Sequence, residues 1–427
     1  MNKDRITVLL GAGYAIPLGG PSTQKITDEI VKTHIDEIDE TLLEKLMESI
    51  KADEKIVAHH YTPNFEDLFH VIEIIWSYIR KEDVDEEIDW NRVIFKGIKY
   101  DISVDEVIKI SQKIYSIIFN EIRKYNDNAH IEKIETWEKN KKFWDELLTK
   151  WKIDFLILNY DTTVEQMLGE DNYQDGFFED MFPLSQKILK HYHVKRFIPQ
   201  KLDEKNNNLI MHLHGCIKYG PKTMGLFPKD IKKLDYEDSN DDVYKYDSID
   251  GIMEEWNAYW EESKKNKFFM RPIITGGNKA NKILINPYQF YHFELQRALI
   301  ENKYLLIIGY SFSDSYLNSL LMRMKQLHGG KRRIVIITYI NDDDKREIDN
   351  INLGGPDAEE INILNRLLPI AKEYDRLMGE PVRYTLAKSI QRNENFTKFG
   401  ENGIIYYCGV EKAFERYGKE IKEFIEG

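Results

Sequence analysis

Cysteine is scarce in this chain. The 427 residues include two cysteines, Cys216 and Cys408. Two cysteines exclude a disulfide framework of the kind that stabilises small secreted proteins, and they exclude any zinc site built from cysteine alone. Because free thiols suit a reducing compartment, we expect the protein to be cytoplasmic.

Long apolar runs are also missing. No segment approaches the roughly 20 consecutive apolar residues with which a helix crosses a membrane. The run near the N-terminus, Ile6–Leu10, is too short for the apolar part of a signal peptide. We therefore expect no membrane among the partners of this protein.

Positive charge is in deficit. The chain has 60 Lys and Arg against 73 Asp and Glu, a net charge of −13. Coating nucleic acid requires a basic face, so we expect no direct nucleic-acid partner. A Gly-x₄-Gly-Lys-Ser/Thr loop is absent as well, which excludes a P-loop ATPase. The hydrophobic fraction of 42% is nevertheless large enough for a folded core.

Short apolar segments that end in glycine or polar residues are the main positive signal. Ile6–Leu10, Phe155–Leu158 and Leu305–Ile308 are four or five apolar residues long, which is typical of parallel strands buried on both faces. Leu209–His214 and Arg333–Thr338 are two further candidates. Between them lie segments with apolar residues at helical spacing. The pattern predicts an α/β fold, a Rossmann-like parallel sheet with a large helical insertion.

The strands and helical segments predict a division into three parts. The helical insertion is either a structural subdomain or a lid or oligomer contact. The smaller insertion contains an acidic loop, which is either solvated surface or a calcium site. The predicted parts are a nucleotide-binding domain from 1–27, 152–217 and 284–427, a helical insertion at 28–151, and a smaller insertion or lid at 218–283.

A glycine-rich loop follows the first predicted strand. Gly11-Ala12-Gly13 lets the backbone approach a ligand closely, and Pro21-Ser22-Thr23 predicts the start of a helix, whose N-terminus can bind phosphate. The dinucleotide fingerprint would have a third glycine where Ile16 stands. A tight structural turn is therefore the alternative interpretation.

Four motifs in order resemble the sirtuin family. Gly11-Ala12-Gly13 with Gly19-Gly20-Pro21 resembles its first NAD-binding loop. Asn159-Tyr160-Asp161 is similar to its Asn-Ile-Asp step, and His214-Gly215 to the His-Gly of its catalytic histidine. Gly309–Asp314, which reads GYSFSD, resembles a signature of sirtuin-like NADase domains in bacterial anti-phage systems, such as HerA-associated and Thoeris-type effectors.

The resemblance implies a catalytic group of Asn159, Asp161 and His214. An amide both donates and accepts, so Asn159 can hold a water and a ribose hydroxyl. Asp161 can accept from a hydroxyl or stabilise a cationic ribose, and His214 can act as the general base. The NAD-binding residues that the resemblance implies are Gly11, Ala12, Gly13, Pro21, Gly309, Ser311 and Asp314.

Departures from the deacetylating sirtuins narrow the expected activity. Ala15 and Ser22 stand where those enzymes have Ser and Asp, and the two Cys-x-x-Cys pairs of their zinc module are missing. We expect no zinc, and an NADase that cleaves NAD to nicotinamide and ADP-ribose as an NAD-depleting effector of anti-phage defence. A homo-oligomer or a HerA-type ring ATPase would regulate it. The alternatives are a non-catalytic NAD or ADP-ribose-binding scaffold for such an ATPase, and a protein deacylase or ADP-ribosyltransferase.

Simpler roles remain open for several of these residues. Asn159 and Asp161 can be turn formers, and Asp314 can cap the helix that follows it. His212 and His214 are two apart in a predicted strand, so we expect them on one face. With His191 and His193 they could bind a metal, although nothing in the sequence supplies a clear third ligand. His212 alone is predicted to be a packing or supporting residue.

Overall fold

The computed structural model describes most of the chain. Within the described ranges, no helix combines the length and apolar character needed to cross a lipid bilayer. The described residues are 4–33, 42–52, 63–79, 104–179, 194–199, 202, 207–220, 243–247, 252, 283, 285–352, 364, 371–378 and 382–426.

The described residues form a main sheet of eight strands. Every neighbouring pair is parallel except β11 and β12, which are antiparallel. The order across the sheet is β11-β12-β10-β9-β1-β2-β6-β3. The strands are β1 (Arg5–Leu10), β2 (Lys152–Ile157), β3 (Tyr173–Gln174), β6 (Asn208–His212), β9 (Tyr304–Ile308), β10 (Arg333–Ile337), β11 (Phe396–Phe399) and β12 (Gly403–Tyr406).

The strand order is that of a doubly wound nucleotide-binding fold. Numbered along the chain, the six central strands from β6 to β12 read 3-2-1-4-5-6. The order reverses between β1 and β9, and open sheets of this kind bind ligands in the crevice outside the carboxyl ends of the strands at such a point. The predicted Rossmann-like parallel sheet is confirmed, and all five predicted strands are present.

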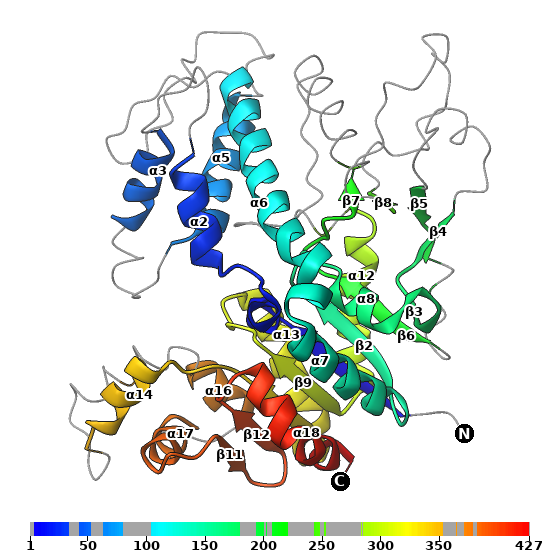
Figure 1. Ribbon diagram of the computed structural model, residues 1–427, viewed down its shortest axis with the longest axis vertical. Helices are drawn as coiled ribbons and strands as arrows, with labels where there is room; N and C mark the ends of the chain where they lie inside the picture. The colour runs from blue at the N-terminus through cyan, green and yellow to red at the C-terminus, as the bar shows by residue number, and fades with distance from the viewer. Residues whose placement is uncertain are drawn as a thin grey trace.

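Alternate residues of each strand pack into two separate cores. In β1, Val8 and Leu10 belong to one core and Leu9 to the other, and all are almost fully buried. One face is covered by α7 (Ile134–Leu148), α8 (Thr163–Leu168) and α18 (Val410–Glu426), and the other by α12 (Tyr288–Glu301) and α13 (Ser315–His328). Figure 1 shows α7 and α18 side by side against the sheet. Burial on both faces explains why the strands are continuously apolar.

The helical segment between β1 and β2 forms a group beside the sheet (Figure 1). The Oγ of Ser22 accepts from Lys25 N at 3.1 Å and so caps α2, as the sequence predicted. Thr27 Oγ1 accepts from Phe65 N at 2.9 Å and ties α2 to α5. The group comprises α2 (Thr23–Val31), α3 (Leu42–Lys51), α5 (Phe65–Ile79) and α6 (Val104–Glu132).

Two features bear on the predicted division into parts, which stays a prediction. α7 lies within 28–151, but its Trp144 packs with Phe155 of β2 in the core of the main sheet. A small antiparallel sheet draws strands from both sides of the 217/218 boundary, in the order β4-β5-β8-β7. Its strands are β4 (Phe177–Glu179), β5 (Val194–Phe197), β7 (Tyr219–Gly220) and β8 (Tyr244–Tyr246).

A buried carboxylate lies at the amino end of the main sheet. Asp154 of β2 is fully buried and forms an ion pair with Arg5 of β1. Its other oxygen accepts from Asn302 Nδ2 at 2.9 Å. The same amide nitrogen lies 3.0 Å from Thr7 Oγ1. This network joins β1, β2 and the end of α12 at the edge of the sheet away from the ends where ligands bind.

Three helices complete the C-terminal part of the fold. They lie near β10, β11 and β12, the three strands at one end of the main sheet (Figure 1). These helices are α14 (Asp342–Asp349), α16 (Ala371–Met378) and α17 (Val382–Gln391).

Candidate active site at the carboxyl edge of the sheet

The loops after β1 and β9 are locked together at the point where the strand order reverses. Gly13 N donates to Gly309 O at 2.9 Å. A Cβ added to Gly11 would lie 2.6 Å from Gly309 O, and one added to Gly309 would lie 2.3 Å from Tyr14 N. Real Cβ atoms essentially never come so close, so each glycine is required by the other loop. The glycines therefore have a structural reason that is independent of any ligand.

The glycine loop continues through two short turns before the predicted helix begins. α1 (Ala12–Ala15) and the 3₁₀ turn η1 (Ile16–Leu18) come first, and α2 starts at Thr23. Ala12 is exposed and Gly13 partly exposed, so the outer side of the loop is accessible. Pro21 is also partly exposed. The loop thus exposes its backbone at the point where the strand order reverses. The resemblance to sirtuins implies that NAD binds to this loop.

Asn159 lies just beyond β2 and reaches back to the glycine loop. Its Nδ2 donates to Gly11 O at 3.1 Å, and the residue is 8% exposed. The partner is 148 residues away, so this amide does not make the local contact expected of a turn former. Its Oδ1 accepts no hydrogen bond from the residues that the structure describes, and it remains able to accept one.

Asp161 is held by the protein through both oxygens. Oδ1 accepts from the backbone N of Thr163 at 3.0 Å and from the Thr163 hydroxyl, and Oδ2 accepts from Tyr125 OH at 2.7 Å. Burial and the neighbouring Asp161 charge raise the pKa of Tyr125 well above its ordinary value. The local contact matches the turn-forming alternative. The carboxylate joins the loop to α6, and its predicted part in catalysis stays a prediction.

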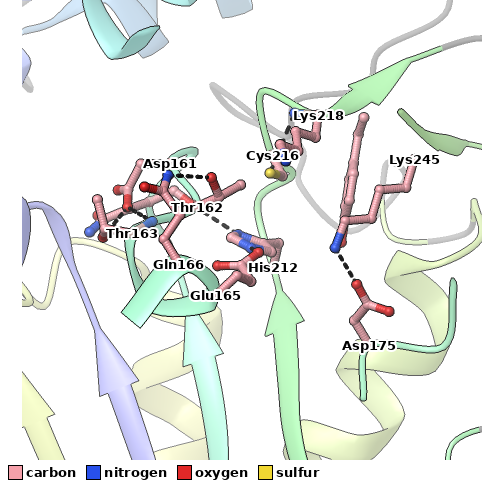
Figure 2. Close-up of polar contacts among 12 residues, drawn as sticks. Asp161, Thr162, Thr163, Glu165, Gln166, Asp175, His212, Cys216, Lys218 and Lys245 are labelled. Atoms are coloured by element: carbon pink, nitrogen blue, oxygen red, sulfur yellow. Dashed lines mark hydrogen bonds and ion pairs between the residues drawn. The ribbon is translucent and has the colours of Figure 1, made fainter. Parts of the chain in front are cut away.

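A second residue of α6 fixes the same loop. Asn126 Oδ1 accepts from Thr162 N at 2.7 Å and from Thr162 Oγ1 at 3.0 Å. Gln166 Nε2 donates to Asn126 O at 3.0 Å. Figure 2 shows the side chains of Asp161, Thr162 and Gln166 where the loop meets α8, and Gln166 Nε2 donates to Thr162 Oγ1 at 3.1 Å. Sequence reasoning missed Tyr125 and Asn126, because nothing local in a helix marks a partner some 36 residues away.

His214 lies in the turn after β6 and faces the loop after β9. Its Nε2 is 3.5 Å from Asp314 Oδ2, and both side chains are about nine-tenths buried. Asp314 Oδ1 accepts from Tyr316 N at 3.0 Å and from Leu317 N at 3.1 Å, so Asp314 also caps α13. One carboxylate thus serves the predicted capping role and orients the candidate base.

The loop after β9 has an unusual backbone. Phe312 has a positive φ of 56°, which is rare for a bulky residue, and Gly309 has φ 62°. Asn318 Nδ2 donates to Phe312 O at 2.7 Å and holds this conformation from α13. Ser311 is exposed, with its Oγ 2.9 Å from Ser313 Oγ. Strain of this kind is concentrated at functional loops.

His212 supports the site from beneath. A carbonyl can only accept, so His212 Nδ1 donates to Asn159 O, at 3.2 Å. Its Nε2 lies 2.7 Å from Glu165 Oε1 (Figure 2). Burial disfavours charge on both side chains, but the charge and hydrogen bond of the partner favour it more strongly. The pKa of Glu165 is therefore lowered and the pKa of His212 is raised. His212 is buried and contacts Asn159 O, and its predicted supporting role stays a prediction.

The expectation that His212 and His214 share one strand face is wrong. β6 ends at His212, and the chain turns there because Gly215 N donates to His212 O at 3.2 Å. The two rings therefore meet different carboxylates, Glu165 and Asp314. Sequence reasoning missed Glu165 as the partner of His212. The one signal available was a carboxylate six residues after Asn159.

Beside Glu165 and His212 lies a second buried ion pair. Lys245 of β8 pairs with Asp175, and both are largely buried (Figure 2). Burial opposes the charge of Lys245, but Asp175 more than offsets it and holds the pKa of Lys245 well above its ordinary value. Burial raises the pKa of Cys216, which lies nearby. The Glu165–His212 pair and the Asp175–Lys245 pair thus lie close together in this buried region.

Several predicted features fall outside the described residues. They are His191 and His193, the acidic loop of the smaller insertion, and its possible calcium site.

Comparison with known proteins gives one family match. Residues 155–353 match a family model described as a SIR2-like domain. No curated protein matches the chain. The matched segment runs from β2 to beyond β10 and contains Asn159, His214 and Gly309, whereas the Gly11–Gly13 loop precedes it. The match covers just under half of the chain, and with the mostly parallel sheet it indicates a SIR2-like domain in that segment, a kind of domain associated with NAD.

Proposed function

We propose that this protein is an NAD⁺ glycohydrolase. The observation that carries the proposal is the meeting of four separate segments at one edge of the sheet. Asn159 binds the Gly11 carbonyl, Gly13 binds Gly309, and His214 faces Asp314. The four motifs that resemble the sirtuin family thus contact one another in pairs, around the switch point where such folds bind nucleotides.

The reaction breaks the bond between nicotinamide and C1′ of its ribose. NAD⁺ and water give nicotinamide, ADP-ribose and a proton. Positive charge grows on the ribose in the transition state, so a site must orient the ribose and deliver water. Asn159 Oδ1 accepts from the water or a ribose hydroxyl, and His214 takes the proton of the attacking water, with Asp314 orienting the ring.

Asp161 has a positioning role in this scheme. Its oxygens are committed to Thr163 and Tyr125, so it keeps Asn159 in place by fixing the loop that carries both residues. Because both oxygens accept hydrogen bonds from protein groups, Asp161 would stabilise a cationic ribose by its negative charge and not by a direct hydrogen bond.

Regulation is part of the proposal. An enzyme that depletes NAD harms its own cell, so its activity needs a trigger. We place this protein among NAD-depleting effectors of anti-phage defence, controlled by self-association or by a partner such as a HerA-type ring ATPase. Purified chain that cleaves NAD at full rate as a monomer would contradict this part of the proposal alone.

The direct test is to incubate the full chain with NAD and to quantify nicotinamide and ADP-ribose. We expect Asn159→Ala and His214→Ala each to abolish NAD loss without loss of fold. Asn128→Ala and His130→Ala change exposed residues of the same types on α6 and should retain activity. The measurement should be made alone, at high protein concentration and with candidate partners.

The products decide between the proposal and its competitors. Free ADP-ribose supports the hydrolase, whereas ADP-ribose attached to protein means a transferase. NAD binding without turnover under every condition means a scaffold. The scaffold has some support in the structure, because the glycines are explained without any ligand.

A further inference from the structure

We propose that Glu165, His212 and Cys216 form a buried binding site for a single zinc ion, directly beneath the Asn159 loop. One ligand atom from each residue lies within 4.8 Å of the other two, and all three residues are buried. Glu165 comes from the first turn of α8, His212 from the end of β6, and Cys216 from the turn that follows β6 (Figure 2). The inference is independent of the proposed NAD chemistry.

The histidine is oriented as metal ligands are. In metalloproteins one ring nitrogen usually donates to a carbonyl or carboxylate, which fixes the tautomer and leaves the other nitrogen for the metal. His212 Nδ1 donates to Asn159 O at 3.2 Å, and Nε2 points at Glu165 and Cys216. The ring thus points Nε2, which without metal lies 2.7 Å from Glu165 Oε1, toward the other two ligand atoms.

The other two ligands also have features that a bound cation would explain. Glu165 Oε2 is buried and has no hydrogen-bond partner among the described residues. A buried carboxylate oxygen without a partner is costly, and a metal would satisfy it. The Sγ of Cys216 accepts from Lys218 N at 3.4 Å, a backbone contact that stabilises charge on sulfur.

The ligand atoms need small adjustments to meet a zinc ion: Nε2 and Oε1, which lie 2.7 Å apart, would separate to about 3.3 Å, and the sulfur would move closer to them. Tetrahedral Zn²⁺ with Zn–S near 2.3 Å and Zn–N near 2.0 Å sets a sulfur–nitrogen separation of about 3.5 Å. The observed limit of 4.8 Å exceeds this by about an ångström, which side-chain rotation can supply. Three protein ligands leave a fourth position for water, as in zinc sites that are not closed.

Charge balance permits the ion in this buried place. A Glu165 carboxylate and a Cys216 thiolate would bring two negative charges to Zn²⁺, and a neutral His212 would bring none, so the filled site would carry no net charge. Lys245 lies nearby, but Asp175 already neutralises it. A mixed nitrogen, sulfur and oxygen set suits zinc better than calcium or magnesium.

This site differs in kind from the zinc module whose absence the sequence shows. That module needs four cysteines, and this chain has two. A site with one cysteine, one histidine and one carboxylate has no fixed sequence spacing, since Glu165 and Cys216 are some 50 residues apart. A metal here would pull His212 and Asn159 O into a fixed position beneath the site.

The test is a Co²⁺ titration of the chelator-treated full chain, with zinc competition. We expect one Co²⁺ per chain, a thiolate-to-cobalt charge-transfer band, and displacement of the band by one equivalent of Zn²⁺. Cys216→Ser should remove the band and weaken metal binding by about 100-fold or more. Cys408→Ser is the matched control, and it should leave band and affinity unchanged.

A second variant guards against loss of fold. Glu165→Gln keeps the size of the side chain and should weaken Co²⁺ binding while circular dichroism stays native. The proposal is overturned if the folded wild-type chain binds less than about a tenth of an equivalent at micromolar metal, or if the band survives in Cys216→Ser. The trio would then be a proton-bridged ion pair beside a neutral thiol.

Discussion

Replacing Gly309 by alanine should destabilise the chain more than its backbone angle alone would require. A Cβ at this position would lie 2.3 Å from Tyr14 N and 2.4 Å from Gly13 C. Both atoms belong to backbone, which cannot rotate away as a side chain does. The loops after β1 and β9 would have to separate, and the Gly13–Gly309 hydrogen bond would lengthen.

The magnitude can be separated into two parts. A residue with a Cβ at φ 62° costs about 1–2 kcal/mol relative to glycine. Overpacking against fixed neighbours adds about 1–3 kcal/mol. Gly400 has φ 59° and nothing within 4 Å of a Cβ, so Gly400→Ala should show the first part only. We expect Gly309→Ala to lower the free energy of unfolding by about 2–5 kcal/mol and Gly400→Ala by about 1–2 kcal/mol.

Urea unfolding is a suitable assay, followed by circular dichroism and tryptophan fluorescence. Trp144 is a useful reporter because its Nε1 donates to Tyr14 OH at 2.9 Å, next to the loop in question. If Gly309→Ala proves no more destabilising than Gly400→Ala, the two loops do not pack as described. The reasoning about the glycines would then fail.

Three further outcomes follow from the buried carboxylates. Asp161→Asn keeps one acceptor oxygen but sets an NH₂ group against either Thr163 or Tyr125 OH, and should lower the free energy of unfolding by about 1–3 kcal/mol, with Asp171→Asn at an exposed position as the control in thermal melts. In the metal-free chain, the Glu165–His212 pair has a lowered carboxyl pKa and a raised imidazole pKa, so its stabilisation is lost as pH falls below the ordinary Glu value of 4.5 and as it rises above the ordinary His value of 6.5. The stability difference between wild type and Glu165→Gln should therefore peak between those values, and a flat profile from pH 4 to 8 would contradict the ion pair. Asp154→Ala should cost about 3–5 kcal/mol in urea unfolding, while NAD cleavage per folded molecule stays unchanged because Asp154 lies at the far edge of the sheet.

The sheet was largely predictable because its signal is local. Strands buried on both faces must be apolar throughout, so Val8, Leu306 and Val335 mark their strands without any long-range information. The helix cap at Ser22 was likewise predictable, since the hydroxyl bonds a backbone N–H three residues on. The order of the strands is not encoded in such local signals, and the sequence analysis did not predict it.

The candidate site was predictable only where a motif supplied the residue. Asn159, His214 and Asp314 were found by motif, but their partners were not. Tyr125 reaches Asp161 from a helix 36 residues earlier, and its contact depends on how α6 crosses the loop. The error about His212 arose because the end of β6 is set by a turn at Gly215, which the apolar pattern of the strand does not encode.

The central position of β1 has a consequence for synthesis on the ribosome. β1 is made before both of its partners, because it pairs with β2 and β9, whose residues lie about 150 and 300 positions later. At 5–20 residues per second, roughly 15–60 seconds separate the emergence of β1 from that of β9. Until then one edge of the central strand has no partner, and the Gly11–Gly13 loop has no Gly309 to bind. The carboxyl edge of the sheet therefore cannot form before β9 has emerged, so the candidate site would stay incomplete until then.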